Sequence, residues 1–164
     1  DRFKVSMKGD GFDHNIIEAV AGDELQGNLF EMKLKLEQIS SILSTDQGQD
    51  FVSAAKRAIS ILESEEKKDK KTYDGSVSEQ TLQEAEEKNL YSALEKVMPE
   101  VEKQISEKNF GSAMSSLATV RETVDLFFDK VVVNDNNAEI RANRLALLSR
   151  IRSCVNKIAD FSRL

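Results

Sequence analysis

Residues 138–161 read AEIRANRLALLSRIRSCVNKIADF, and this stretch decides the fold class of the chain. Apolar side chains recur in it at the spacing of one buried helix face. They are Ile140, Leu145, Leu147, Leu148, Ile151, Val155 and Ile158. The polar run at 134–137 (NDNN) precedes the stretch, and asparagine is a favoured helix N-cap. The pattern predicts a long helix with one face against a core.

Four upstream segments repeat this helical spacing. The predicted helices cover residues 23–43, 49–66, 79–106 and 110–133. The chain has one proline and seven glycines, so few residues interrupt helices. Pro99 lies inside the third segment and predicts a break near residues 97–98. The short apolar run at 130–133 is interpreted as a helix end, so the predicted fold class is an all-α helical bundle.

We interpret the N-terminal part of the chain as a separate segment. A short helix is predicted from His14, between the possible cap Asp13 and Gly22. We expect residues 1–22 to close off a preceding part of a longer protein and residues 23–164 to form one helical domain. Residues 65–78 are predicted to be the least ordered stretch inside that domain.

The charge distribution is uneven along the chain. The net charge is −6, yet residues 137–164 carry six basic and two acidic side chains, a local charge of +4. The rest of the chain therefore carries −10. An acidic body with one basic helix suits a protein that touches a polyanion at one face. The other interpretation is a solvated basic helix end, and charge alone does not separate the two.

Motifs for catalysis and metal binding are missing from the sequence. It contains no GxxxxGK[ST], GxGxxG or GxSxG pattern. A single histidine, His14, and a single cysteine, Cys154, cannot supply the usual zinc set. One cysteine also excludes an internal disulfide, so a reducing cytoplasm is the expected compartment. No stretch approaches the about 18 apolar residues of a membrane helix. We predict neither catalytic nor metal-binding residues.

Ordered motifs near the C-terminus suggest a family. VDLFFDKVVVN at 124–134 precedes RANRLALL at 141–148, and the chain closes with IADFSRL at 158–164. Upstream, AKRA at 55–58 lies in an apolar helix, and YDG at 73–75 follows in the linker. Together these blocks resemble the C-terminal anticodon-binding domain of the bacterial, two-subunit type of glycyl-tRNA synthetase β-subunit.

That resemblance implies a fold and a role. The fold would be the helical anticodon-binding type of class I synthetases, also found in arginyl-tRNA synthetases. The segment would bind glycine tRNA as a non-catalytic part of a ligase. ATP and Mg²⁺ would serve the complete enzyme, and the partners would be the synthetase α-subunit and the rest of the β-subunit, in an α2β2 assembly. The alternative is a helical protein–protein interaction module without RNA binding, which the acidic composition favours.

Candidate RNA-binding residues are cationic or amide side chains on one plausible rim. They are Lys56, Arg57, Lys130, Asn134, Arg141, Asn143, Arg144, Arg150 and Lys157. Arginine can hold phosphate with two parallel bonds, and asparagine can pair with a base edge. Tyr73 is the candidate for base stacking, whereas Phe127 and Phe128 lie at core spacing. For each candidate the competing interpretation is an internal ion pair, a helix cap or plain solvation.

Overall fold

The computed structural model describes residue 16 and residues 29–159 of the chain. Its elements are α3 (Leu29–Leu43), α4 (Asp46–Asp69), the 3-10 helix η1 (Glu79–Thr81), α5 (Ala85–Ser106), α6 (Phe110–Ala118), α7 (Arg121–Lys130) and α8 (Ala138–Asn156). All regular secondary structure in this part of the chain is helical, which confirms the predicted all-α class. The predictions for Asp13, His14, the boundary at residue 22 and the closing residues 160–164 lie outside the described residues.

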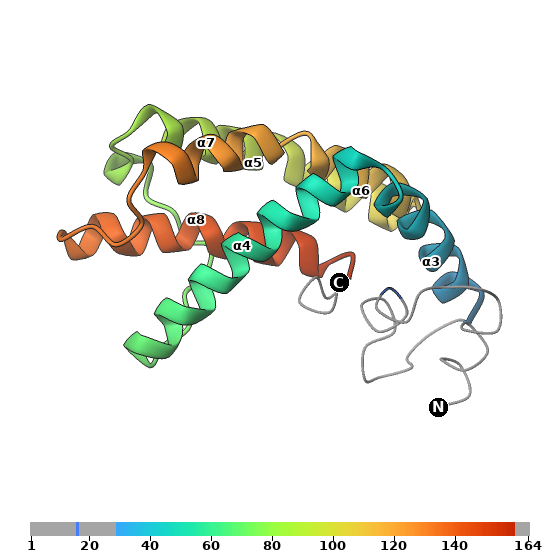
Figure 1. Cartoon of the computed structure of the whole chain (residues 1–164), viewed down its shortest axis with the longest axis horizontal. Coiled ribbons are helices and arrows are strands. Elements are labelled where there is room, and N and C mark those ends of the chain that lie inside the picture. Colours follow the sequence, from blue (N-terminus) through green and yellow to red (C-terminus); the bar gives the residue numbers. More distant parts are fainter. Residues whose placement is uncertain (1–15, 17–28, 160–164) are drawn as a thin grey trace.

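The helices form a bundle in which α4 runs obliquely across α8, and α5 lies beside α7 (Figure 1). α3 packs against α6 at one end of the bundle. The core collects the apolar faces of the six α-helices between residues 29 and 159. Its largest fully buried side chains are Phe51, Phe127, Leu36, Ile39, Leu62, Leu90, Leu94, Met114, Leu117 and Leu145. Within the described residues, no helix is long and apolar enough to cross a membrane.

The connection between α3 and α4 is shorter than predicted. α4 begins at Asp46, three residues before the predicted start, because the Thr45 hydroxyl accepts a hydrogen bond of 3.0 Å from the Gly48 amide. Gly48 is buried against the end of α3, where a Cβ atom would lie 2.2 Å from the Ile42 carbonyl oxygen. A glycine is therefore needed for the two helices to meet this closely.

The start of α5, in contrast, was predicted too early. Residues 79–81 form the separate turn η1, and α5 begins at Ala85. A reciprocal capping box at Glu84 and Glu87 sets this start: the Glu84 amide donates to the Glu87 carboxylate over 3.1 Å. The capping box thus places the start of the long helix six residues later than the predicted residue 79.

The predicted break at Pro99 is wrong. α5 continues without interruption from Ala85 to Ser106 with Pro99 inside it. Proline removes one backbone donor, so an acceptor one turn earlier loses its partner. Pro99 faces solvent, where water can bond that acceptor, while Val97 and Val101 keep the opposite face buried.

The predicted helix at 110–133 is in fact two helices. Thr119 and Val120 separate α6 from α7, with amide bonds to carbonyls only three residues earlier. α7 then ends at Lys130, and Val131 is extended, with φ −113° and ψ 129°. The run at 131–133 is therefore not a helix end, because the extended backbone directs the Val131 side chain into the core.

Candidate nucleic-acid interface

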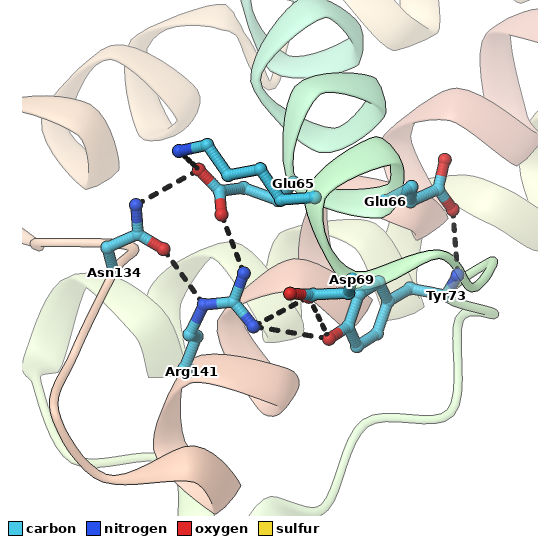
Figure 2. A network of polar contacts seen from close by, with 7 residues as sticks. Glu65, Glu66, Asp69, Tyr73, Asn134 and Arg141 are labelled. Carbon is cyan, nitrogen blue, oxygen red and sulfur yellow. Dashed lines mark hydrogen bonds and ion pairs between the residues drawn. The ribbon is translucent and has the colours of Figure 1, made fainter.

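A polar network joins the C-terminal turns of α4 to the first turns of α8 (Figure 2). Arg141 lies at its centre and donates to Glu65 over 2.6 Å and to Asp69 over 2.7 Å. Its Nε donates to the Asn134 side-chain oxygen over 2.8 Å, and Asn134 in turn donates to Glu65 over 3.0 Å. Tyr73 completes the network by donating its hydroxyl to Asp69 over 2.7 Å. Arg141 and Asn134, both predicted RNA contacts, thus hold two helices and a loop together.

Charge pairing in this network shifts the pKa of several groups. The bond from Arg141 is the main cause that lowers the pKa of Glu65, followed by the bond from Asn134. The pKa of Asp69 is lowered by Arg141 and then by the Tyr73 hydroxyl. Burial, together with the bond to Asp69, raises the pKa of Tyr73. At neutral pH Glu65 and Asp69 are therefore ionised and paired with Arg141, while the Tyr73 hydroxyl keeps its proton.

α8 also fixes the linker between α4 and α5. Asn143 is buried, accepts a bond of 2.7 Å from the Ser78 amide and donates one of 3.1 Å to the Ser78 carbonyl. Arg150 donates to the Gly75 carbonyl over 2.7 Å and is ion-paired with Glu95. The stretch that the sequence marked as least ordered is therefore pinned along one helix face.

A second anchor holds the start of the same linker. Arg152 makes a two-pronged ion pair with Glu66, with distances of 2.6 and 3.0 Å. This pairing lowers the pKa of Glu66, and the Tyr73 amide donates to the same carboxylate over 2.7 Å. The Ser149 hydroxyl donates to the Tyr73 carbonyl over 2.7 Å. Tyr73 thus acts as a fixed residue of the linker, while its ring lies beneath Lys71 at 4.6 Å.

Arg144 is the most enclosed of the predicted RNA contacts. It is 4% exposed, and its guanidinium donates to Glu87 over 2.7 Å and to the Val132 carbonyl over 2.5 Å. Asp135 lies 3.4 Å from the guanidinium nitrogen that donates to the Val132 carbonyl. These bonds tie α8 to α5 and to the extended segment after α7. In this conformation the side chain is not available to a ligand at the surface.

Lys157 is paired as well, with Glu102 of α5, although it is more exposed than the arginines of α8. Like Lys157, the predicted contacts Asn134, Arg141, Asn143, Arg144 and Arg150 make hydrogen bonds or ion pairs within the protein. The positive charge counted at the C-terminal end of the sequence is thus largely neutralised by carboxylates from α4 and α5.

The remaining three candidates are exposed and lie on α4 and at the end of α7, two helices in contact. They are Lys56, Arg57 and Lys130. The Arg57 guanidinium lies over the Phe128 ring, 4.5 Å from its centroid. Phe127 is fully buried as predicted, whereas Phe128 is only half-buried and meets Phe127 edge-on at 5.6 Å. The structure therefore brings a cation and an aromatic ring together at the surface.

A hollow of about 450 Å³ opens between the linker and the first turns of α8. Tyr73, Asp74, Thr81, Glu139 and Asn143 are among the residues that line it. Lys71 also lines the hollow, so the two carboxylates leave it one net negative charge and offer acceptors to a ligand with amino groups. Among the described residues, no group of three or more His, Cys, Asp or Glu side chains is arranged to hold a metal ion.

Three acidic residues of α4 were not predicted from the sequence to take part in this region. Glu65, Glu66 and Asp69 anchor Arg141 and Arg152 of α8, and Glu65 is only 6% exposed. The helical spacing held a clue, because Glu65 continues the buried face of Ile59 and Leu62 by one further turn. An acidic residue at a core position requires a cationic partner, and the sequence does not say which one.

Comparison with known proteins assigns the family. The chain is 39% identical over 165 residues to the glycine–tRNA ligase beta subunit of Rhodospirillum centenum, a match that covers all of this chain and 23% of the relative. The chain thus spans about a quarter of the length of that relative. The model of the DALR anticodon binding domain matches residues 52–161, from the second turn of α4 through α8. The chain belongs to the DALR anticodon binding domain family.

Proposed function

We propose that this chain is the anticodon-binding part of the β-subunit of a two-subunit glycine–tRNA ligase. It binds glycine tRNA at the anticodon loop and takes no part in bond making itself. The observation that carries the proposal is the identity of 39% along the whole chain to a glycine–tRNA ligase beta subunit, joined to a family match over residues 52–161. The function requires a cytoplasmic location, where translation takes place.

The α4–α7 face is the surface that suits RNA best. Arg57 is exposed there on a half-buried aromatic ring and Lys130 is exposed at the end of α7, whereas the arginines of α8 are held by carboxylates. An anticodon loop offers unstacked bases and closely spaced phosphates, which such side chains recognise. The polar network around Arg141 has a different role in this proposal: it keeps α4, the linker and α8 in a fixed arrangement.

The chemistry of the ligase reaction lies elsewhere in the complete enzyme. ATP and Mg²⁺ activate glycine in the α-subunit, and the chain works within an α2β2 assembly that includes the rest of the β-subunit. The domain contributes affinity and selection for the correct tRNA. It therefore affects the KM for tRNA more than the rate of glycine activation.

Deletion of this segment from the complete ligase tests the proposal. The assembly is made with and without residues 29–164, and light scattering verifies that both forms contain the same subunits. We expect glycine-dependent exchange of pyrophosphate into ATP to persist, while kcat/KM for tRNA falls by about 100-fold, as the loss of several phosphate and base contacts implies. Unchanged kcat/KM for tRNA would favour a protein–protein role for the segment.

A further inference from the structure

The arginines of the described region divide into two classes. Five of the six in residues 29–159 form ion pairs with carboxylates: Arg121, Arg141, Arg144, Arg150 and Arg152. Arg57 is the exception, since it has no carboxylate partner within this part of the chain and lies instead on the Phe128 ring at 4.5 Å. The net charge of the protein is −6, yet within residues 29–159 no carboxylate offsets the positive charge of Arg57.

Phe128 gives this arginine a rigid support. The ring is half-buried and meets the fully buried Phe127 at 5.6 Å with an interplanar angle of 70°, a favourable edge-to-face geometry. Arg57 projects from the middle of α4, and its neighbours Ala54, Ala55 and Ala58 pack that helix into the core. A guanidinium placed on an anchored ring loses little further freedom when it binds a ligand.

The surroundings favour an anionic, planar ligand. The α4 residues Ser53 and Ser60, which lie one turn before and one turn after Arg57, are exposed and uncharged. Asp129 is the acidic residue next to the ring in sequence, and it too is exposed. Arg57 is itself exposed, so the side of its guanidinium away from the ring is open to solvent. Such a surface can stack on one base and contact a neighbouring phosphate.

We propose that Arg57 and Phe128 form a stacking platform for one unpaired base of an RNA loop. The base lies on the outer face of the guanidinium, so that ring, cation and base form one stack. This inference rests on the proposed function, because it names the residues through which the tRNA loop is held. An acidic protein partner would need the charge of Arg57 but not its planar face, which separates the two possibilities.

The test compares variants of the chain on an anticodon stem-loop of a glycine tRNA that carries 2-aminopurine at one loop position at a time. R57K keeps the charge and removes the planar stack, whereas F128L keeps an apolar side chain and removes the ring. R121K is the matched control, since Arg121 pairs with Asp125 one turn later within α7. Affinity is measured by fluorescence at several salt concentrations, and far-ultraviolet circular dichroism verifies the fold of each variant.

We expect the wild-type chain to quench 2-aminopurine at one loop position, and R57K to lose that quenching together with about tenfold in affinity. F128L should weaken binding in the same direction, R121K should bind as the wild type does, and the salt dependence of R57K should match the wild type. If R57K bound and quenched as the wild type does, the platform would be refuted while the proposed function stood. Absence of loop binding by the wild-type chain would overturn both.

Discussion

The carboxylate of Glu87 and the guanidinium of Arg144 form an ion pair of 2.7 Å in which the two side chains are 0% and 5% exposed. The partners are 57 residues apart in the sequence and join α5 to α8. Glu87 also accepts the Glu84 amide in the capping box of α5. A single carboxylate thus determines where one helix begins and how another is oriented, so its pairing is central to the stability of the domain.

Removal of one partner from this pair should destabilise the fold strongly. In R144M the Glu87 carboxylate stays buried without its cation, and the free energy of unfolding should fall by about 3–5 kcal/mol. The double variant R144M/E87Q should recover part of that loss, because a neutral amide is easier to bury and can still accept the capping bond. Urea unfolding followed by circular dichroism gives both values. Equal stability of R144M and the wild type would contradict the account of this pair.

Arg141 should likewise support stability more than RNA binding. R141M leaves the buried Glu65 carboxylate with weaker partners, so unfolding should become easier by about 2–3 kcal/mol. R141K restores the charge but not the multiple bonds to Glu65, Asp69 and Asn134, and should be intermediate. Urea unfolding of the three proteins, beside their affinity for tRNA at the same salt concentration, separates the two roles. A loss of affinity without a loss of stability would instead place Arg141 in the RNA interface.

The same network predicts acid sensitivity. The folded protein holds the pKa of Glu65 and Asp69 below their ordinary values, chiefly through Arg141. Their contribution to stability is therefore complete above the unfolded pKa values of about 4, and it is lost as pH falls through the lower, folded values. We expect the unfolding free energy of the wild type to fall more steeply below about pH 5 than that of R141M. If the unfolding free energies of the wild type and R141M fell in parallel with pH, Arg141 would not be the cause of the lowered pKa values.

Cys154 provides a probe of the core. It is the only cysteine, it is fully buried, and burial raises the pKa of its thiol to about 11. At pH 8 the folded protein should react with a disulfide reagent only through opening of the bundle, so the labelling rate should rise with urea in step with unfolding. Because the pKa of the thiol is higher in the folded state, the thiol ionises first in the unfolded state. The free energy of unfolding should therefore also fall as pH rises above about 8.5. A fast labelling phase in native buffer would contradict the burial.

Pro99 should be replaceable with a gain in stability. P99A restores a backbone donor in the middle of α5, where the structure shows an unbroken helix and an exposed position. We expect the free energy of unfolding to rise by about 1–3 kcal/mol. Proline also restricts the unfolded chain, and losing that restriction makes the gain smaller. A decrease would mean that the proline ring or a local bend is needed for packing against α8.

Helical spacing was enough to predict the fold class and most of the core. Phe51, Ala55, Ile59 and Leu62 follow one face of α4 as the spacing requires. Helix ends were less predictable because tertiary contacts decide them. The close approach of Gly48 to Ile42 and the capping box at Glu84 lie outside what a periodic pattern encodes.

The candidate site was predicted only in part, for a physical reason. A basic side chain in a sequence can face RNA or a carboxylate, and the choice depends on which acids the fold brings near. Arg141 meets Glu65 across 76 residues, a distance that no local pattern spans. Arg57 was predicted as a contact and is exposed, but its position over Phe128 follows from the packing of α4 on α7.

Direct titration of the chain with a glycine tRNA transcript, beside the same tRNA with its anticodon bases replaced, tests the central claim most directly. Filter binding at low and moderate salt gives both the affinity and the salt dependence. We predict that the unaltered tRNA binds more tightly by at least about tenfold, as one or two lost base contacts would imply, and that affinity falls as salt rises. Equal affinity for the two transcripts, or none for either at low salt, would contradict an anticodon-binding role for this chain.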